Sequence, residues 1–282
     1  MDRSVLLALC LPMLAACSPG PPSFGDAPVV RNGGPAGPSS ADSARRRAAC
    51  SGWGSETGGA VVDLGANGKL DIYPIGDSIT LGTNGGYRNE VFDRLTADGY
   101  DVDMLGSLND QFTRAADKDH EGHGGLNTGG VLENLDTWMA PLPAPDLVLL
   151  MIGTNDLAWD FGRPAMETFG RLDTIIDRLF KAQPTVTVIV ASIPPLTPKE
   201  VAIDAKPVQR AEAVNAYNAL AKARVKQRAA AGQRIAFAEV NRRLNVADLA
   251  DGVHPTAEGY VKVGDAFYEA AHSVLPAPPG CN

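Results

Sequence analysis

The chain has 282 residues, of which 44% are hydrophobic and 21% are charged, and its formal net charge is −8. This length and composition suffice for one sizeable core, and no internal repeat suggests a solenoid. The acidic balance argues against nucleic-acid binding, which needs a basic face to displace counterions from phosphate. We therefore expect a single folded domain that does not bind nucleic acid.

The amino terminus is typical of an exported bacterial protein. An apolar run from Val5 to Ala16 is too short to span a bilayer but matches the core of a signal peptide. The run ends in Leu-Ala-Ala-Cys at Cys17, which resembles a bacterial lipobox. This resemblance implies that residues 1–16 are removed and that the Cys17 thiol carries a lipid, the only expected link to a membrane. Alternatively, Cys17 is an ordinary small residue near a secretory cleavage site. Either way, the expected location is extracytoplasmic, as a cell-envelope lipoprotein or a secreted protein.

Residues 17–49 are rich in proline, glycine and serine and lack a periodic apolar pattern. Such a segment cannot repay the entropy of ordering, so it is predicted to be a flexible linker, with the folded domain over residues 50–282. The domain keeps two cysteines, Cys50 and Cys281, one at each end. In an oxidising compartment this even pair predicts a disulfide, and no Cys-x-x-Cys pair suggests zinc.

From residue 70 onward, short β-rich runs alternate with longer helical patterns, which is typical of a parallel sheet covered on both faces. We expect an α/β three-layer sandwich with a five-stranded parallel sheet. The predicted strands are Leu70–Ile75, Val102–Leu105, Leu147–Ile152, Val186–Ser192 and Ile235–Ala238. The predicted helices are Tyr87–Ala97, Gly130–Met139, Ala165–Ala182, Val208–Ala231 and Ala257–Ala271.

Polar segments lie where functional residues are expected. In open α/β sheets, ligands bind outside the carboxyl ends of the strands. Gly76-Asp77-Ser78 follows the first strand, the segment from Gly153 to Asp156 follows the third, and the segment from Asp251 to His254 lies beyond the fifth. These three segments are predicted to meet at one edge of the sheet.

Ser78, His254 and Asp251 are the residue types of a nucleophile, a base and a group that orients the base. A serine hydroxyl is a poor nucleophile at neutral pH unless a base takes its proton. Asp251 lies three residues before His254, so one short loop allows its carboxylate to reach the imidazole. By itself this spacing is also compatible with a turn or a helix cap.

The segments GDSIT, HEGHGG, GTND and DGVHP resemble blocks I, II, III and V of the SGNH hydrolases, the GDSL-like esterase superfamily. The resemblance covers roughly residues 70–271 and implies a flavodoxin-like SGNH fold. It also implies that Ser78 is the nucleophile, His254 the base and Asp251 its orienting acid. Neither a cofactor nor a metal is expected, because the two histidines of HEGH are too close together for a His-Glu-x-x-His zinc helix.

The same resemblance implies an oxyanion hole made of the Ser78 and Gly125 backbone N–H groups and the Asn155 side chain. Gly124 is the alternative for the glycine, because the sequence cannot show which of the two N–H groups points inward. Without the resemblance, Gly125 could be a turn glycine and Asn155 a cap at a strand end. Neutral donors of this kind stabilise the charge that develops on a tetrahedral intermediate.

Within the superfamily, the blocks are most similar to carbohydrate esterase family three, the acetyl xylan esterases. This similarity implies an extracytoplasmic serine esterase that removes acetyl or other short acyl groups from carbohydrate. A lysophospholipase or thioesterase, and a carbohydrate-binding lipoprotein without activity, are the alternatives. Tyr87, Arg88 and Trp159 are candidates for substrate contact, although the aromatic residues could instead be core or lid and Arg88 could form an ion pair or begin a helix.

Overall fold

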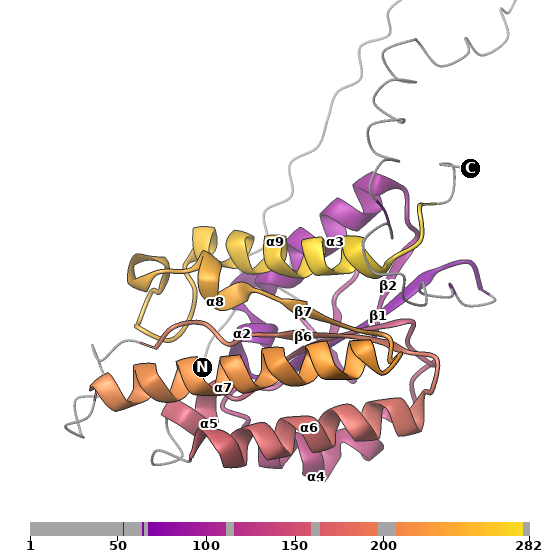
Figure 1. Ribbon diagram of the computed structural model, residues 1–282. Helices are drawn as coiled ribbons and strands as arrows, with labels where there is room; N and C mark the ends of the chain where they lie inside the picture. Colours follow the sequence, from indigo (N-terminus) through magenta and orange to yellow (C-terminus); the bar gives the residue numbers. More distant parts are fainter. Residues whose placement is uncertain are drawn as a thin grey trace, which may run out of the picture.

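The computed structural model of the chain describes residues 53, 64, 67–110, 116–158, 164–196 and 207–278 (Figure 1). Cys17, Cys50, Cys281 and Trp159 lie outside the described residues. The lipid, the disulfide and the Trp159 substrate contact therefore stay predictions. Within the described part, no helix is long and apolar enough to cross a membrane.

The predicted α/β sandwich is confirmed, and its centre is a twisted sheet whose five main strands all run parallel. The three central strands are buried on both faces, mostly through Leu, Ile and Val side chains, as in a sheet covered by helices on both sides. In space the main strands follow the order β2-β1-β5-β6-β7, which is the flavodoxin-like order. Their bounds are β1 (Leu70–Gly76), β2 (Val102–Met104), β5 (Leu147–Met151), β6 (Thr187–Ala191) and β7 (Ile235–Ala238).

Two further strands extend this sheet and were not predicted. β4 (Asp119–Gly122) runs parallel to β1, and β3 (Leu108–Asn109) runs antiparallel to β4. Two strands pair along the same edge of β1: β2 pairs with its first half, and β4 pairs with its last two residues. The segment that carries HEGH is thereby placed at the carboxyl end of β1.

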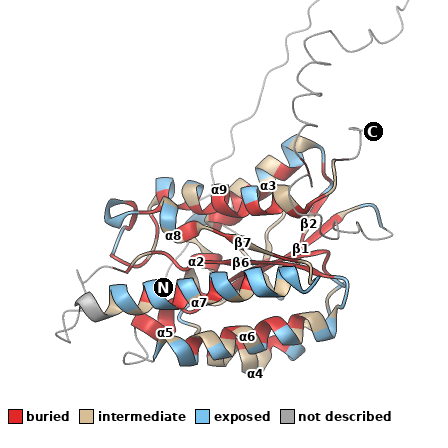
Figure 2. Cartoon of the chain, in the orientation of Figure 1, coloured by how far each residue is buried: buried red, intermediate tan, exposed pale blue. Residues whose placement is uncertain are grey.

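Helices cover the two faces of the sheet in separate layers (Figure 1). α3 (Tyr87–Asp98) packs against α9 (Ala257–Val274) on one face, and α6 (Ala165–Ala182) packs against α4 (Thr128–Met139) and α7 (Pro207–Ala230) on the other. The inward faces of these helices are buried and their outward faces exposed (Figure 2). The five predicted helices are thus confirmed, with ends that differ by at most three residues and with α6 matched at both ends. Short helical turns complete the chain: α2 (Ser78–Leu81), α5 (Thr154–Ala158), α8 (Val240–Arg243), η1 (Thr83–Gly85) and η2 (Val246–Asp248).

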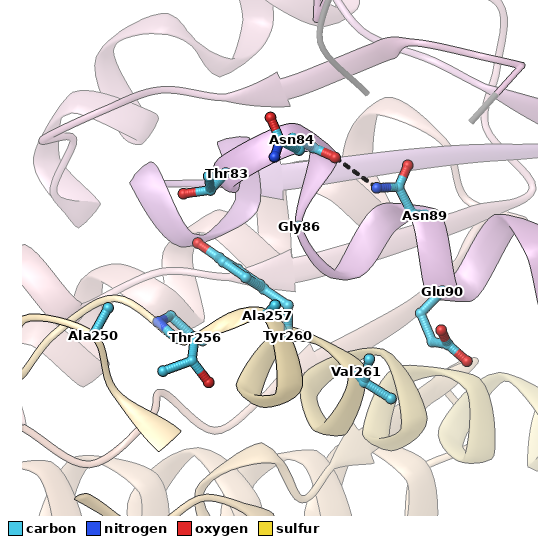
Figure 3. Close-up of a pocket in the computed structure, with 11 residues that line it drawn as sticks. Thr83, Asn84, Gly86, Asn89, Glu90, Ala250, Thr256, Ala257, Tyr260 and Val261 are labelled. Carbon is cyan, nitrogen blue, oxygen red and sulfur yellow. Dashed lines mark hydrogen bonds between the residues drawn. The ribbon is translucent and has the colours of Figure 1, made fainter. Parts of the chain in front are cut away.

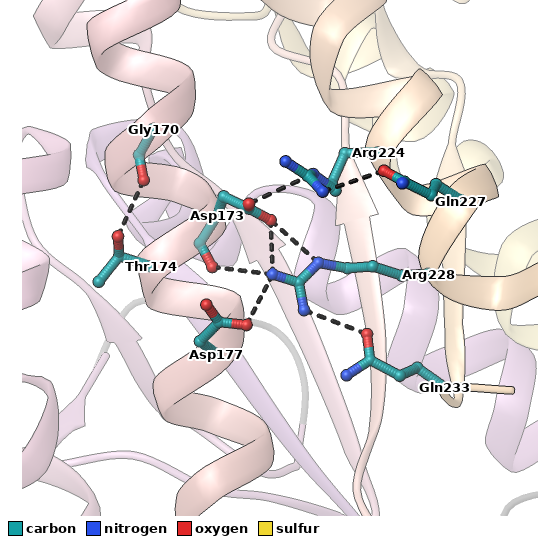
Figure 4. A network of polar contacts seen from close by, with 8 residues as sticks. All are labelled: Gly170, Asp173, Thr174, Asp177, Arg224, Gln227, Arg228 and Gln233. Atoms are coloured by element: carbon teal, nitrogen blue, oxygen red, sulfur yellow. Dashed lines mark hydrogen bonds and ion pairs between the residues drawn. The ribbon is translucent and has the colours of Figure 1, made fainter. Parts of the chain in front are cut away.

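A polar network joins the outer surfaces of α6 and α7 (Figure 4). Arg228 donates to both Asp173 and Asp177, at 2.6 and 2.7 Å, and Arg224 pairs with Asp173 at 3.2 Å. The Asp177 side chain is 64% exposed, so its contact with Arg228 is screened by solvent and contributes little. The network fixes how two helices of one layer lie against each other, away from the sheet edge that carries the polar segments.

Candidate active site

Three polar segments meet at the carboxyl edge of the sheet, as predicted. α2 follows β1, α5 follows β5, and the loop from Asp251 to His254 precedes α9. Figure 1 shows α2, α5 and the beginning of α9 at the same end of the sandwich. The ends of two strands and the loop before α9 therefore place the serine, the asparagine and the histidine at one edge of the sheet.

Ser78 is the first residue of α2, directly after the buried strand β1. Asp77 caps this helix, and its Oδ1 accepts the Ile79 N–H at 2.9 Å. Gly76 is required before this turn, because a Cβ there would lie 2.2 Å from the Met151 carbonyl oxygen. The sharp strand-to-helix turn leaves the Ser78 side chain partly exposed.

Ser78, His254 and Asp251 form a hydrogen-bonded chain. The Ser78 Oγ lies 2.8 Å from His254 Nε2, and His254 Nδ1 lies 2.6 Å from Asp251 Oδ2. A carboxylate only accepts, so Nδ1 carries the hydrogen and Nε2 is left to take the serine proton. This is the geometry that a serine needs in order to be activated by a base.

Asp251 is held as a carboxylate by its own loop. Its Oδ1 accepts the N–H groups of Val253 and His254, at 3.0 and 2.7 Å. Partial burial raises the pKa of this carboxyl, but the hydrogen bonds from His254 and Val253 outweigh that effect and lower the pKa to about 2. Asp251 is therefore ionised at neutral pH and can orient the imidazole and stabilise its protonated form.

The glycines after β4 form a tight turn beside Ser78. The Leu126 N–H donates to the His123 carbonyl at 3.2 Å, and Gly125 has a φ of +76°, as the third residue of a type II turn requires. The His123 N–H donates to the Gly76 carbonyl at 3.0 Å, which fixes the turn to the end of β1. We name residues 123–126 the glycine turn.

Asn155 connects the second and third polar segments. Its Nδ2 donates to the Leu126 carbonyl at 2.8 Å, so one amide hydrogen holds the glycine turn, and the other donates to none of the residues that the structure describes. The side chain of the next residue, Asp156, accepts both the N–H and the hydroxyl of Thr128, at 2.9 and 2.6 Å. Asn155 therefore belongs to a rigid corner, and its role as an oxyanion donor, like that of Gly125, stays a prediction.

Glu121 was not predicted as part of the site, although it stands inside the HEGH segment. Its buried carboxylate accepts the Ser107 N–H at 2.9 Å and the Ser107 hydroxyl at 2.7 Å. His123 Nε2 contacts the same carboxylate at 2.5 Å, and the His123 ring stacks on Trp138. Glu121 thus fixes the start of the glycine turn. The only sign of this role in the sequence was the position of an acidic residue between the two histidines of the HEGH segment.

Two buried titratable groups flank the serine segment. Burial raises the pKa of Asp77 to about 6, although the Ile79 N–H favours the ionised form. Burial, followed by the positive charge of Arg88, lowers the pKa of His120 to about 4, so this ring is neutral at pH 7. His120 Nδ1 accepts the Gly122 N–H at 3.0 Å, which makes His120 part of the support for β4.

The predicted substrate contacts of Tyr87 and Arg88 are wrong, because both side chains are buried. Tyr87 stacks on Phe267 with ring centroids 4.7 Å apart, so the core alternative holds for it. Arg88 donates to the carbonyls of Thr80 and Leu81 and pairs with Asp110 at 3.3 Å. Arg88 therefore satisfies the last carbonyls of α2 and supports the serine from behind.

Comparison with known proteins agrees with this geometry. Residues 75–262 match the GDSL-like Lipase/Acylhydrolase family. The chain is 29% identical over 241 residues to a multidomain esterase of Ruminococcus flavefaciens, covering 76% of this chain but only 30% of the length of that esterase.

Two solved structures are also similar. A family 3 carbohydrate esterase of Clostridium thermocellum is 32% identical with a TM-score of 0.60, and the match covers 72% of this chain and 94% of that one. A carbohydrate esterase family 3 protein of Talaromyces cellulolyticus is 28% identical with a TM-score of 0.61, covering 71% and 95%. With its serine, histidine and aspartate in one hydrogen-bonded chain, the protein belongs to the GDSL-like lipase/acylhydrolase (SGNH) family.

Proposed function

We propose that this protein is an exported serine esterase that removes acetyl or other short acyl groups from carbohydrate. The observation that carries the proposal is the chain of hydrogen bonds from Ser78 Oγ through His254 to Asp251. The carbohydrate esterases among the similar structures support a carbohydrate substrate. The signal-peptide pattern that ends at Cys17 supports export and lipid anchoring.

The reaction would proceed in two halves. Ser78 Oγ attacks the ester carbonyl while His254 Nε2 takes the hydroxyl proton, and His254 then gives this proton to the departing alcohol oxygen. A water molecule then attacks the acyl-serine while His254 Nε2 takes its proton, and His254 returns this proton to Ser78 Oγ as the acyl–oxygen bond breaks, which releases the acid and restores the serine hydroxyl. Asp251 stays ionised throughout, because its pKa lies near 2.

The negative oxygen of each tetrahedral intermediate needs donors on the side of Ser78 that faces the glycine turn. We assign the Ser78 N–H, the Gly125 N–H and the second amide hydrogen of Asn155, with the Gly124 N–H as the alternative for the glycine. Each preorganised donor of this type contributes about 3 to 4 kcal/mol to stabilisation of the transition state. The Asn155–Leu126 hydrogen bond supports the assignment, because it holds the amide beside the glycine turn.

Labelling with an organophosphonate tests the proposed nucleophile. The phosphonate should attach to Ser78 in the full chain and not to a Ser78→Ala variant, as mass spectrometry of the labelled peptide would show. Absence of label on the folded wild type would favour a binding protein without activity. Faster hydrolysis of long-chain than of acetyl esters would instead favour a lysophospholipase or thioesterase.

A further inference from the structure

A groove lies directly beside the loop that carries His254. Its volume is about 780 Å³, within the range of about 300–1,000 Å³ that is usual for small-ligand sites. One wall comes from Ala250 and Thr256, on the two sides of the catalytic loop, and the opposite wall from Thr83 and Asn84, which follow α2 (Figure 3). Pro255 also lines the groove. We call this feature the flank groove.

The proposed reaction gives this side of the site a defined role. The oxygen of the carbonyl must face the glycine turn and Asn155, whereas the departing alcohol oxygen must face His254 Nε2 to receive its proton. The alcohol part of the ester therefore extends towards the His254 loop. The flank groove lies next to that loop, because Ala250 before it and Pro255 and Thr256 after it line the groove.

The chemistry of the flank groove fits a neutral ligand with many hydroxyl groups. Asn84 and Thr83 are exposed on one wall and offer amide and hydroxyl groups, while Ala257 and Val261 give apolar surface on the other. Among the described residues that line it, Glu90 is the only charged one and no lysine, arginine or histidine is present. Sugars present hydroxyl groups and C–H faces together, whereas a phosphate group would meet a carboxylate and no cation.

The conformation of Asn84 is a second, independent observation. It has a φ of +53° and is the only non-glycine residue at positive φ in the described part of the chain. Its carbonyl accepts a hydrogen bond from the Asn89 side chain at 2.6 Å, so the backbone is fixed while the Asn84 side chain is exposed. Residues kept in this sparsely populated region cluster at ligand sites.

The floor of the flank groove is rigid. Tyr260 of α9 is 5% exposed, and Figure 3 shows its hydroxyl directed to the loop that carries Thr83. A Cβ on Gly86 would lie 2.9 Å from the Tyr260 ring, so the loop packs closely on this side chain. The two walls are thus held at a fixed separation by one buried aromatic residue.

We propose that the flank groove binds the saccharide portion of the ester, on the leaving-group side of Ser78. This inference rests on the proposed esterase function and adds the place where the carbohydrate is recognised. It predicts that the groove contributes to hydrolysis of acetylated oligosaccharides and contributes much less to hydrolysis of p-nitrophenyl acetate, whose leaving group is a single small ring.

The experiment compares these two substrate classes in variants of the full chain. Val261→Trp fills the groove from α9, where Val261 is 45% exposed, and Asn84→Gly removes the amide while allowing positive φ. For the best substrate among acetylated xylo-, cello- and manno-oligosaccharides, each variant should lower kcat/KM by about tenfold, mainly through KM. Hydrolysis of p-nitrophenyl acetate should fall much less, because its small leaving group makes few contacts with the groove, so the ratio of oligosaccharide to p-nitrophenyl acetate kcat/KM should drop by about fivefold or more.

Met166→Trp is the matched control, because Met166 is also an exposed apolar residue but belongs to α6. It should leave both substrates unchanged. The proposal would be overturned if Val261→Trp and Asn84→Gly left the ratio of the two activities unchanged, whether both activities stayed at the wild-type level or both fell equally. A wild type that hydrolyses p-nitrophenyl acetate but none of the oligosaccharides would refute the carbohydrate substrate and with it the flank groove, but not the esterase activity; hydrolysis of the oligosaccharides with an unchanged ratio in the variants would refute the flank groove alone. A wild type inactive on every ester would refute the esterase function itself.

Discussion

The stability difference between an Asp77→Asn variant and the wild type should shift in favour of the variant as the pH rises from acidic to neutral. Asp77 is fully buried, and its Oδ2 has no partner at hydrogen-bond distance and angle among the described residues; the nearby Thr154 hydroxyl favours the ionised form less than burial opposes it. Asparagine can keep the cap on the Ile79 N–H, because its side-chain oxygen accepts in the same way. The substitution therefore removes mainly a buried charge.

The magnitude follows from the pKa of Asp77, which burial raises from the ordinary value of 3.8 to about 6. Because the folded-state pKa lies above the unfolded-state value, this carboxyl contributes stability below pH 4 that is lost as the pH rises through 6. A pKa difference of this size corresponds to about 3 kcal/mol. Part of this difference is already lost at pH 4, where the unfolded-state carboxyl is about half ionised, so the stability of Asp77→Asn relative to wild type should increase by about 2 kcal/mol between pH 4 and pH 8.

Urea unfolding of both proteins at pH 4, 6 and 8, followed by circular dichroism, measures this difference directly. Other titrating groups are common to both proteins and cancel in the comparison. Asp136→Asn is the control for the substitution as such, because the Asp136 side chain is 77% exposed. A difference that stays constant with pH, or that decreases as the pH rises, would refute the argument that burial controls the ionisation of Asp77.

Three further predictions concern the oxyanion hole and the cysteines. Asn155→Ala should lower kcat by about a hundredfold or more with KM little changed, because the amide acts on the transition state; a higher KM with kcat intact would contradict the assigned donor. Native mature protein should contain a Cys50–Cys281 disulfide, and titration of two free thiols would show this pairing to be wrong. Cys17→Ala should abolish membrane partitioning and leave esterase activity intact, whereas unchanged partitioning would argue against the lipobox.

The main strands and helices could be predicted because their patterns are strong and local. β5 and β6 are continuous apolar runs, and the long helices carry apolar stripes that bury one face. β4 could not be predicted, because Asp119–Gly122 is polar and short. Its extended form depends on pairing with β1, and its buried Glu121 is satisfied by Ser107, which lies 14 residues away.

The candidate site was predictable where the chemistry requires a given side chain and not where packing decides. Ser78, His254 and Asp251 stand in motifs whose spacing encodes contact, and the structure brings them together. Tyr87 and Arg88 illustrate the opposite case. An aromatic and a basic residue after a glycine-rich loop fit a ligand site and a core equally well. Tyr87 is buried against Phe267 only because α9, which comes much later in the chain, packs on it.

The hydrogen bond between Ser78 and His254 joins residues that are 176 positions apart. Ser78 follows the first strand, whereas His254 precedes the last helix, which must pack on α3 before the pair can form. Closing so long a loop is entropically unfavourable, and contacts of this range slow folding. Recovery of ester hydrolysis during refolding should therefore report the docking of α9, whereas far-ultraviolet circular dichroism reports the helices and strands that form without it.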